Sequence, residues 1–112
     1  MIIKEVPTYQ ATISLGLREQ YTDKYHNINE VIDLCQEYCD CIGLCVTVTP
    51  TYFIYTGGKK DGCFVGLINY PRFPSSSEDI LKKTFDLAYI LKVKFNQNRV
   101  SIICNDKTYM IE

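Results

Sequence analysis

The sequence predicts a single α+β domain, and three patterns lead to this fold class. Apolar and polar residues alternate along Tyr9–Leu17 and again along Leu44–Thr49, as in strands with one buried face. Two longer segments, 28–42 and 77–95, repeat their apolar residues at helical spacing. The elements follow the order strand, helix, strand, strand, helix, strand, with room for an extra C-terminal strand. That order is typical of the ferredoxin-like sandwich, an antiparallel sheet with two helices on one face.

The first third of the chain holds one strand, one loop and one helix. The strand Tyr9–Leu17 is followed by a polar loop, Arg18–His26, without a period. Asn27 and Glu30 have the spacing of a capping box, which predicts that the first helix starts there. Gly43 follows the last periodic residue, where a left-handed cap is expected.

A β-hairpin is predicted in the middle of the chain. The strand Leu44–Thr49 meets Pro50, which has no N–H to donate and so indicates an edge position, a bulge or a bend. The strand resumes as Tyr52–Tyr55. Gly57–Gly62 is then predicted as the hairpin connection, and Cys63–Tyr70 as the returning strand.

The last third begins with a proline-rich exit from the sheet. The serines 75–77 offer caps for the second helix, predicted over 77–95. Val100–Cys104 and Thr108–Ile111 are the predicted final strands.

Composition limits the classes of partner. The 112 residues suffice for one domain, 1–112, and carry 12 basic and 13 acidic side chains. This balance leaves no broad basic surface, so we expect neither long nucleic acid nor an anionic membrane as a partner. The N-terminus lacks a secretory signal and no apolar run approaches ~20 residues, so we expect a cytoplasmic protein.

Six cysteines raise the question of a metal or redox site. Four of them follow the spacing C-x3-C-x-C-x3-C between positions 35 and 45, unlike the paired knuckles of zinc sites. On a helix, Cys41 is rotated roughly 200° from Cys39, so the four sulfurs do not converge. We expect reduced, mostly buried thiols and no metal or cofactor, with a metal site and a redox pair as the alternatives.

No catalytic constellation is evident. His26 is the only histidine and lies in a loop, and no known signature surrounds a cysteine that might pair with it. Glu78 and Asp79 suit the start of a helix better than acid–base chemistry. We therefore expect a protein without enzymatic activity.

A ligand site is predicted where the hairpin exits into the second helix. A helix start attracts anions through its free amides. Arg72 adds a forked donor, and the rings of Tyr70 and Phe73 are suited to stacking on a base. The candidate contacts are Asn69, Tyr70, Arg72, Phe73 and Ser76. The alternative is structural, with prolines that stiffen the loop, serines that cap the helix and aromatics at the core edge.

One face of the predicted sheet is expected to remain uncovered. Polar residues alternate with apolar ones on the strands and gather on this face, and exposed tyrosines suit it: Thr12, Ser14, Thr47, Thr49, Tyr52, Tyr55 and Tyr70. A ferredoxin-like sheet with an open face commonly dimerises, so a homodimer is expected there. Lys59 and Lys60 are interpreted as solubilising charges on the turn.

The segments LCVTVTPTYFIYTGG, GLINYPRFPSSSEDI, NQNRVSI and YQATISLGLRE resemble small single-domain proteins of phages and mobile elements. The resemblance implies an accessory, anti-defence role, either blocking a host protein or sequestering a nucleotide messenger in a dimer-interface pocket. It adds Arg99 to the residues expected to contact a nucleotide.

Together these observations predict a non-enzymatic, oligomeric binding protein that sequesters a small phosphorylated ligand of the nucleotide type. The alternative is a protein–protein inhibitor that acts on a host protein through the open sheet face and the loop Arg18–His26.

Overall fold

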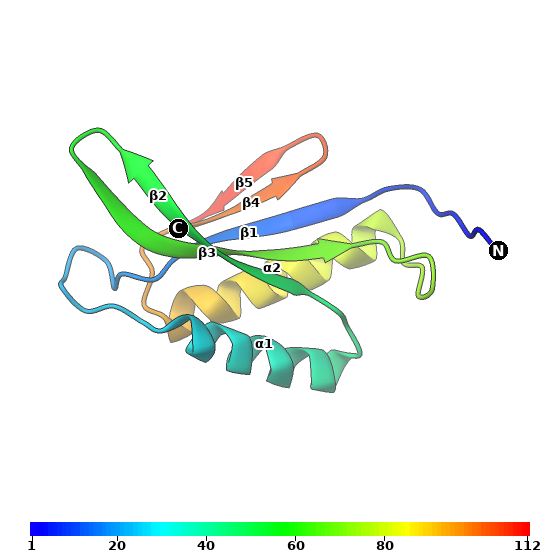
Figure 1. The fold of residues 1–112 in the computed structure, drawn as a ribbon, viewed down its shortest axis with the longest axis horizontal. Coiled ribbons are helices and arrows are strands. Elements are labelled where there is room, and N and C mark those ends of the chain that lie inside the picture. The colour runs from blue at the N-terminus through cyan, green and yellow to red at the C-terminus, as the bar shows by residue number, and fades with distance from the viewer.

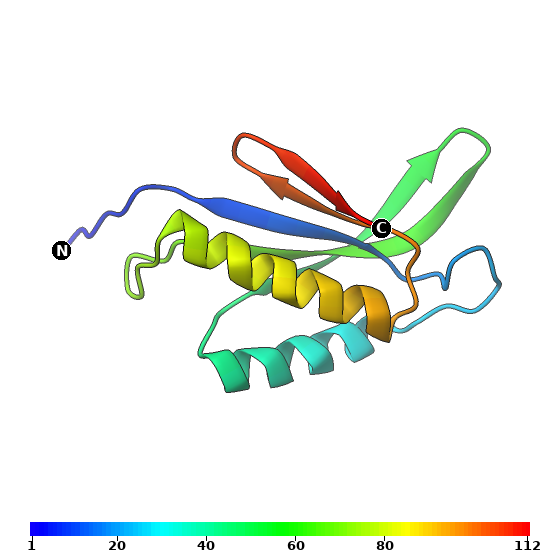
Figure 2. The same ribbon diagram turned by 180° about the vertical axis from the view of Figure 1, so that it is seen from behind.

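The computed structural model describes all 112 residues and shows a five-stranded antiparallel sheet with both helices on one face (Figures 1 and 2). The strands lie in the order β2-β3-β1-β4-β5. In chain order the elements are β1 (Gln10–Gly16), α1 (Ile28–Ile42), β2 (Thr47–Tyr55), β3 (Gly58–Ile68), α2 (Ser77–Lys94), β4 (Val100–Cys104) and β5 (Thr108–Ile111). The predicted ferredoxin-like fold with an extra C-terminal strand is confirmed.

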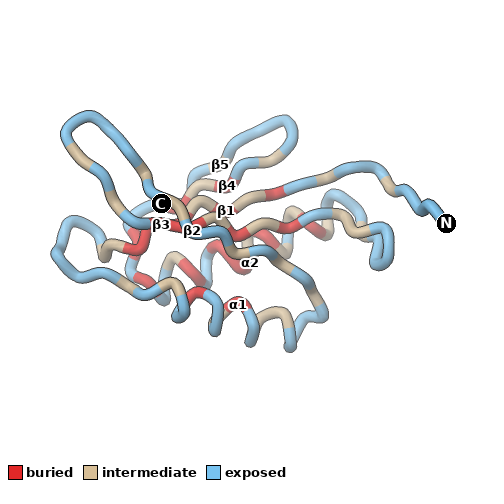
Figure 3. The backbone as a smooth tube through the Cα atoms, in the orientation of Figure 1, coloured by how far each residue is buried: buried red, intermediate tan, exposed pale blue.

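The core lies between the sheet and the two helices, where Figure 3 shows the buried residues gathered. β1 is the central strand because its alternate residues are fully buried, and Ile13 pairs with Val65 on β3 and Ile102 on β4. Leu87 and Leu91 of α2 cover this row and are also fully buried. Truncating one such side chain to alanine typically costs about 2–5 kcal/mol.

The helix ends follow the predicted capping signals. The side chain of Asn27 accepts a hydrogen bond from the Asn29 amide at 2.8 Å, and Glu30 accepts one from the Asn27 amide at 2.7 Å. Gly43 adopts the left-handed conformation with φ 76°. Ser76 caps α2 by accepting from the Asp79 amide at 3.1 Å. The four free amides at the start of each helix explain why these residue types stand there.

The hairpin turn differs from the prediction. β2 continues through Pro50 as an edge strand, and Tyr55 pairs with Gly58, so the turn is the two residues between them. Gly57 has φ 84°, a conformation that tight hairpin turns require and glycine adopts without strain. The prediction that Gly57–Gly62 forms the connection is therefore wrong, and Lys60 lies in a strand instead of a turn.

The open face of the sheet is present, but Tyr52 is not on it. Alternation from Val48, which pairs with the buried Val65, places Tyr52 on the helix side. Thr12 and Thr49 lie on the opposite, uncovered side, as predicted. Neither helix is long and apolar enough to cross a membrane.

All six cysteines are free thiols. Cys35 and Cys63 are buried, but Cys41 and Cys45 are exposed because they lie at and beyond the end of α1, so the prediction of mostly buried thiols holds only in part. No three His, Cys, Asp or Glu side chains form a group that could hold a metal ion.

Candidate functional site

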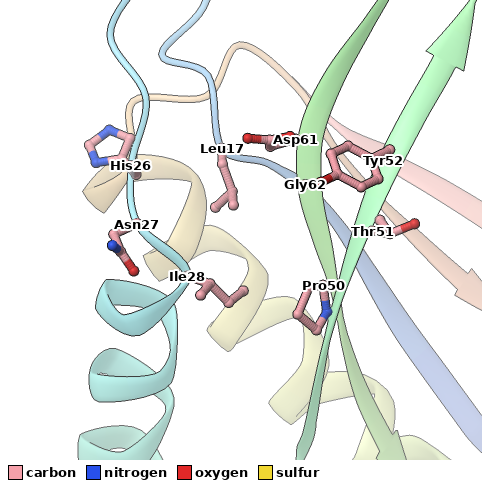
Figure 4. Close-up of a pocket in the computed structure, with 9 residues that line it drawn as sticks. All are labelled: Leu17, His26, Asn27, Ile28, Pro50, Thr51, Tyr52, Asp61 and Gly62. Atoms are coloured by element: carbon pink, nitrogen blue, oxygen red, sulfur yellow. The ribbon is translucent and has the colours of Figure 1, made fainter.

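A cleft of about 380 Å³ opens at the end of the sheet where β1 leads into the loop before α1. The start of α1 forms one wall and the β2–β3 hairpin forms the other (Figure 4). We call it the hairpin cleft and define it by Leu17, Ile28, Pro50, Tyr52 and Asp61. These residues come from four separate stretches of the chain.

Backbone hydrogen bonds hold the cleft in place. The amide of Leu17 donates to the carbonyl of Asp61 at 3.0 Å, and the amide of His26 donates to the carbonyl of Leu17 at 2.8 Å. The end of β1 is thus bonded to β3 on one side and to the entry of α1 on the other. The polar loop between them closes on itself through a bridge between Arg18 and Tyr25.

The cleft combines an apolar floor with one ring and one charge. Leu17, Ile28 and Pro50 supply the apolar surface. The side chain of Tyr52 is 67% exposed, so its ring is free to stack on a ligand. Asp61 is exposed and takes part in none of the ion pairs of the structure. This combination suits a ligand with an aromatic base and a positive charge.

The rim of the cleft adds negative charge around His26. The imidazole is 11% exposed, with Nε2 3.3 Å from Oε2 of Glu19 and Nδ1 3.6 Å from Oε2 of Glu30. The Nε2 contact lacks hydrogen-bond geometry. A hydrogen bond from Asn96, at 2.7 Å, is the main cause that lowers the pKa of Glu19. Glu19 therefore stays ionised at neutral pH, but it is paired with the ammonium of Lys24 at 3.3 Å, so Asp61 is the unpaired negative charge of the cleft.

The residues predicted from the sequence to bind a ligand do not converge on one site. Asn69, Tyr70, Arg72, Phe73 and Ser76 lie on the connection between β3 and α2. Arg99 follows α2, and the 18 residues of this helix span about 27 Å. Arg99 is therefore at the other end of the molecule from the remaining five.

Several of these residues have structural partners. Asn69 donates through Nδ2 to the Pro7 carbonyl at 2.9 Å and accepts through Oδ1 from the Ser75 amide at 2.8 Å. The guanidinium of Arg72 lies 5.3 Å from the ring centroid of the exposed Phe73. These contacts order the loop, and a part in ligand binding stays a prediction.

A second cavity of about 360 Å³ lies beside this loop and is lined by Tyr70 and Phe73. We call it the loop cavity. The Cys45 thiol donates to the Tyr70 hydroxyl at 3.6 Å, and Lys83 at the edge pairs with Asp79 at 2.9 Å. No carboxylate lines the loop cavity, which makes it less suited to a cationic ligand than the hairpin cleft.

Tyr52 and Asp61 line the hairpin cleft but are not among the residues that the sequence predicts to bind a ligand, because the hairpin turn is shorter than expected. From the sequence, Tyr52 is expected on the open face and Asp61 in the turn. The alternation of residues through Pro50 was the signal that would have placed Tyr52 correctly. No local signal connects either residue with Leu17 or Ile28.

The protein is thus an α+β sandwich, and a cleft large enough for a small ligand lies at the start of α1. No protein-family model matches the sequence, and no curated protein matches it. Among solved structures, the chain is similar to a phage SAM lyase in complex with S-methyl-5′-thioadenosine, with a TM-score of 0.83 and 18% identity over 99% of this chain and 94% of that one. It is also similar to a phage SAM lyase in the apo state, with a TM-score of 0.77 and 21% identity over 92% of this chain and 87% of that one. At these identities the likeness shows a shared fold.

These neighbours contradict the prediction of a non-enzymatic protein that sequesters a nucleotide or, alternatively, inhibits a host protein. Both neighbours are enzymes. The expectation rested on the lack of a recognisable Cys/His pair, but a lyase whose substrate carries its own leaving group needs no such pair. Both neighbours are phage proteins, and one binds a small nucleoside derivative, which agrees with the predicted class of protein and with a small ligand. That ligand carries no phosphate group, so the neighbours do not support the predicted phosphorylated ligand.

Proposed function

We propose that this protein is an enzyme that cleaves S-adenosylmethionine (SAM) and releases S-methyl-5′-thioadenosine, with residues 1–112 acting as one domain. The observation that carries the proposal is the agreement of the backbone with a phage SAM lyase over 99% of the chain. The hairpin cleft is the proposed substrate site.

SAM carries its own leaving group. The sulfur is a sulfonium, so breaking its bond to the four-carbon amino acid chain releases a neutral thioether that needs no proton. A lyase adds no water. The four-carbon fragment therefore either closes a ring through its own carboxylate or loses a Cβ proton and forms a double bond. Ring closure needs no base, whereas the elimination needs a base, from the protein or the solvent, to accept the Cβ proton.

The hairpin cleft matches two features of SAM, its adenine ring and its positive charge. The exposed ring of Tyr52 suits the adenine, and stacking of a base on an aromatic ring is worth roughly 1–3 kcal/mol. The unpaired carboxylate of Asp61 suits the sulfonium or the ammonium group. The apolar floor suits the ribose face and the methyl group.

The test is incubation of the purified protein with SAM, with chromatographic detection of S-methyl-5′-thioadenosine and proton NMR of the four-carbon product. We expect the thioether to accumulate together with the cyclic ester or the unsaturated amino acid, and homoserine, the product of hydrolysis, to be absent at early times before any cyclic ester opens in water. Tyr52→Ala should weaken SAM binding about 5- to 160-fold, whereas Tyr52→Phe should retain it because the ring remains.

Phe73→Ala tests the location, since it alters the loop cavity and leaves the hairpin cleft intact. A loss of SAM binding in Phe73→Ala alone would move the substrate to the loop cavity. Absence of both SAM binding and thioether release from the folded protein would overturn the proposed function.

We also propose that the protein self-associates through the open face of its sheet and acts in the cytoplasm of a phage-infected cell. Cleavage of SAM removes a methyl donor from that cell, which agrees with the predicted anti-defence role. Expression in bacteria should lower the cellular ratio of SAM to S-methyl-5′-thioadenosine, and an unchanged ratio with an active enzyme would argue against this setting.

A further inference from the structure

Three basic side chains converge beside the hairpin, in a cavity separate from the hairpin cleft. Arg18, Lys60 and Arg99 line a pocket of about 110 Å³ that shares no lining residue with the cleft. We call it the basic pocket. The remaining lining residues are uncharged, namely Gln20, Tyr21, Gln97 and Asn98, so no carboxylate lines the pocket.

The positive charges of the basic pocket are poorly compensated. Arg18 and Lys60 belong to none of the ion pairs of the structure. The Nε atom of Arg18 is buried and has no hydrogen-bond partner, which is unfavourable for a buried donor. Arg99 has one distant contact, 3.9 Å from Nε to Oε1 of Glu112, and both side chains are more than half exposed. Such exposed pairs contribute little.

The surrounding residues hold these cations in place. Gln97 is 7% exposed and donates through Nε2 to the carbonyls of Arg18 at 2.8 Å and Phe95 at 3.0 Å. It thereby fixes the segment before Arg99 against the end of β1. The ammonium of Lys60 lies 5.7 Å from the Phe53 ring centroid, in the space left by the missing side chain of Gly16. The pocket is therefore a built feature of the sheet end.

We propose that the basic pocket binds a compact oxyanion, presented as a phosphate or a carboxylate group. Two guanidinium groups and one ammonium supply the charge and the directed donors that such a group needs. The volume of about 110 Å³ suits a single oxyanion group and is smaller than a whole nucleotide. The basic pocket lies outside the proposed substrate site, and the proposal stands independently of SAM cleavage.

The test measures the melting temperature of the whole protein in sodium phosphate, sodium acetate and sodium chloride at equal ionic strength. Phosphate, acetate or both should raise the melting temperature in a saturable way that chloride does not reproduce. The salt that acts identifies the group that the pocket takes. Binding needs no turnover, so a failure here is distinct from a failure to cleave SAM.

Arg99→Gln is the main variant because Arg99 is exposed and its loss leaves the core intact. Arg99→Gln should weaken binding of the stabilising anion at least tenfold, and Lys60→Gln should do the same. Lys82→Gln removes an exposed charge on α2, outside the pocket, and should leave binding unchanged. The proposal is overturned if neither oxyanion stabilises the protein beyond chloride, or if Lys82→Gln weakens binding as much as Arg99→Gln.

Discussion

Asp61 shows how one side chain separates substrate binding from catalysis in the proposed reaction. Its carboxylate is the one acidic group that lines the hairpin cleft. The sulfonium of SAM loses its charge as the carbon–sulfur bond breaks. A carboxylate that attracts this cation therefore stabilises the bound substrate more than the transition state.

Asp61→Asn should consequently raise the KM for SAM without lowering kcat. An exposed pair is worth about 0.2–1 kcal/mol, so the expected rise is a few-fold. Steady-state release of the thioether measures both constants. Asp106→Asn, in the β4–β5 turn, is the control and should change neither. A collapse of kcat at constant KM would assign Asp61 a different role.

Cys63 links burial to the pH dependence of stability. It is fully buried, and desolvation raises the pKa of its thiol from 9.0 to about 11. In the unfolded chain the thiol ionises near pH 9, whereas in the folded chain it stays neutral up to about pH 11. The stabilisation is thus complete below pH 9 and is lost as the pH rises toward 11.

The free energy of unfolding in urea should therefore decline from pH 9 to pH 11, and the decline should be smaller in Cys63→Ala than in the wild type. Alanine lowers stability at every pH because it leaves a small cavity, so the slope with pH is the quantity to compare. Cys41→Ala, at an exposed thiol, should keep the wild-type slope. Equal slopes in all three proteins would show that Cys63 does not titrate abnormally.

At the scale of elements, the β2–β3 hairpin decides which residues line the hairpin cleft. Its two-residue turn fixes the register, and the register determines the side of the sheet that each residue faces. A shift by one residue would move Tyr52 from the hairpin cleft to the open face. Gly62 helps to hold this geometry, since it lies where the hairpin crosses the end of β1.

Gly62→Ala should disturb the hairpin more than Gly66→Ala, although both glycines lie on β3. A Cβ at Gly62 would overlap the Phe53 ring and approach the Leu15 carbonyl oxygen to 2.8 Å. This carbonyl belongs to the backbone and cannot rotate away as a side chain can. A Cβ at Gly66 meets only the Thr47 hydroxyl at 2.7 Å. Overpacking of this kind costs about 1–3 kcal/mol, measurable by urea denaturation. Equal losses in the two variants would contradict this account.

For the whole molecule, the asymmetry of the sheet is the main feature. One face is covered by both helices and the other is not (Figure 1). On the uncovered face, Ile68, Ile103 and Met110 are 41%, 45% and 57% exposed. Apolar side chains spread over an open sheet face favour association with a second sheet.

The mass of the wild-type protein from light scattering should accordingly exceed that of one chain. Ile103→Lys places a charge beside the central strand and should shift the mass to the monomer. Val93→Lys, at a 61% exposed position on α2, is the matched control and should leave the mass unchanged. A wild-type protein that is monomeric at all concentrations would exclude this interface.

What the sequence alone determined is local. The capping box at Asn27 and Glu30 and the left-handed Gly43 set both ends of α1, because these interactions reach no more than five residues along the chain. Alternation placed Ile13 in the core for the same reason. The open sheet face followed from the order of the elements.

Only the tertiary structure decided where the cavities lie and which residues line them. Leu17, Ile28 and Asp61 meet in the hairpin cleft because the register of β3 on β1 and the return of the loop bring them together. Arg18 and Lys60 meet through the same register, and the bond from Gln97 to the Arg18 carbonyl brings Arg99 to them. The sequence groups Arg99 instead with residues at the far end of α2. Periodicity reports which side of an element a residue faces, but not which distant element lies opposite it. A site built from four separate stretches therefore leaves no local trace in the sequence.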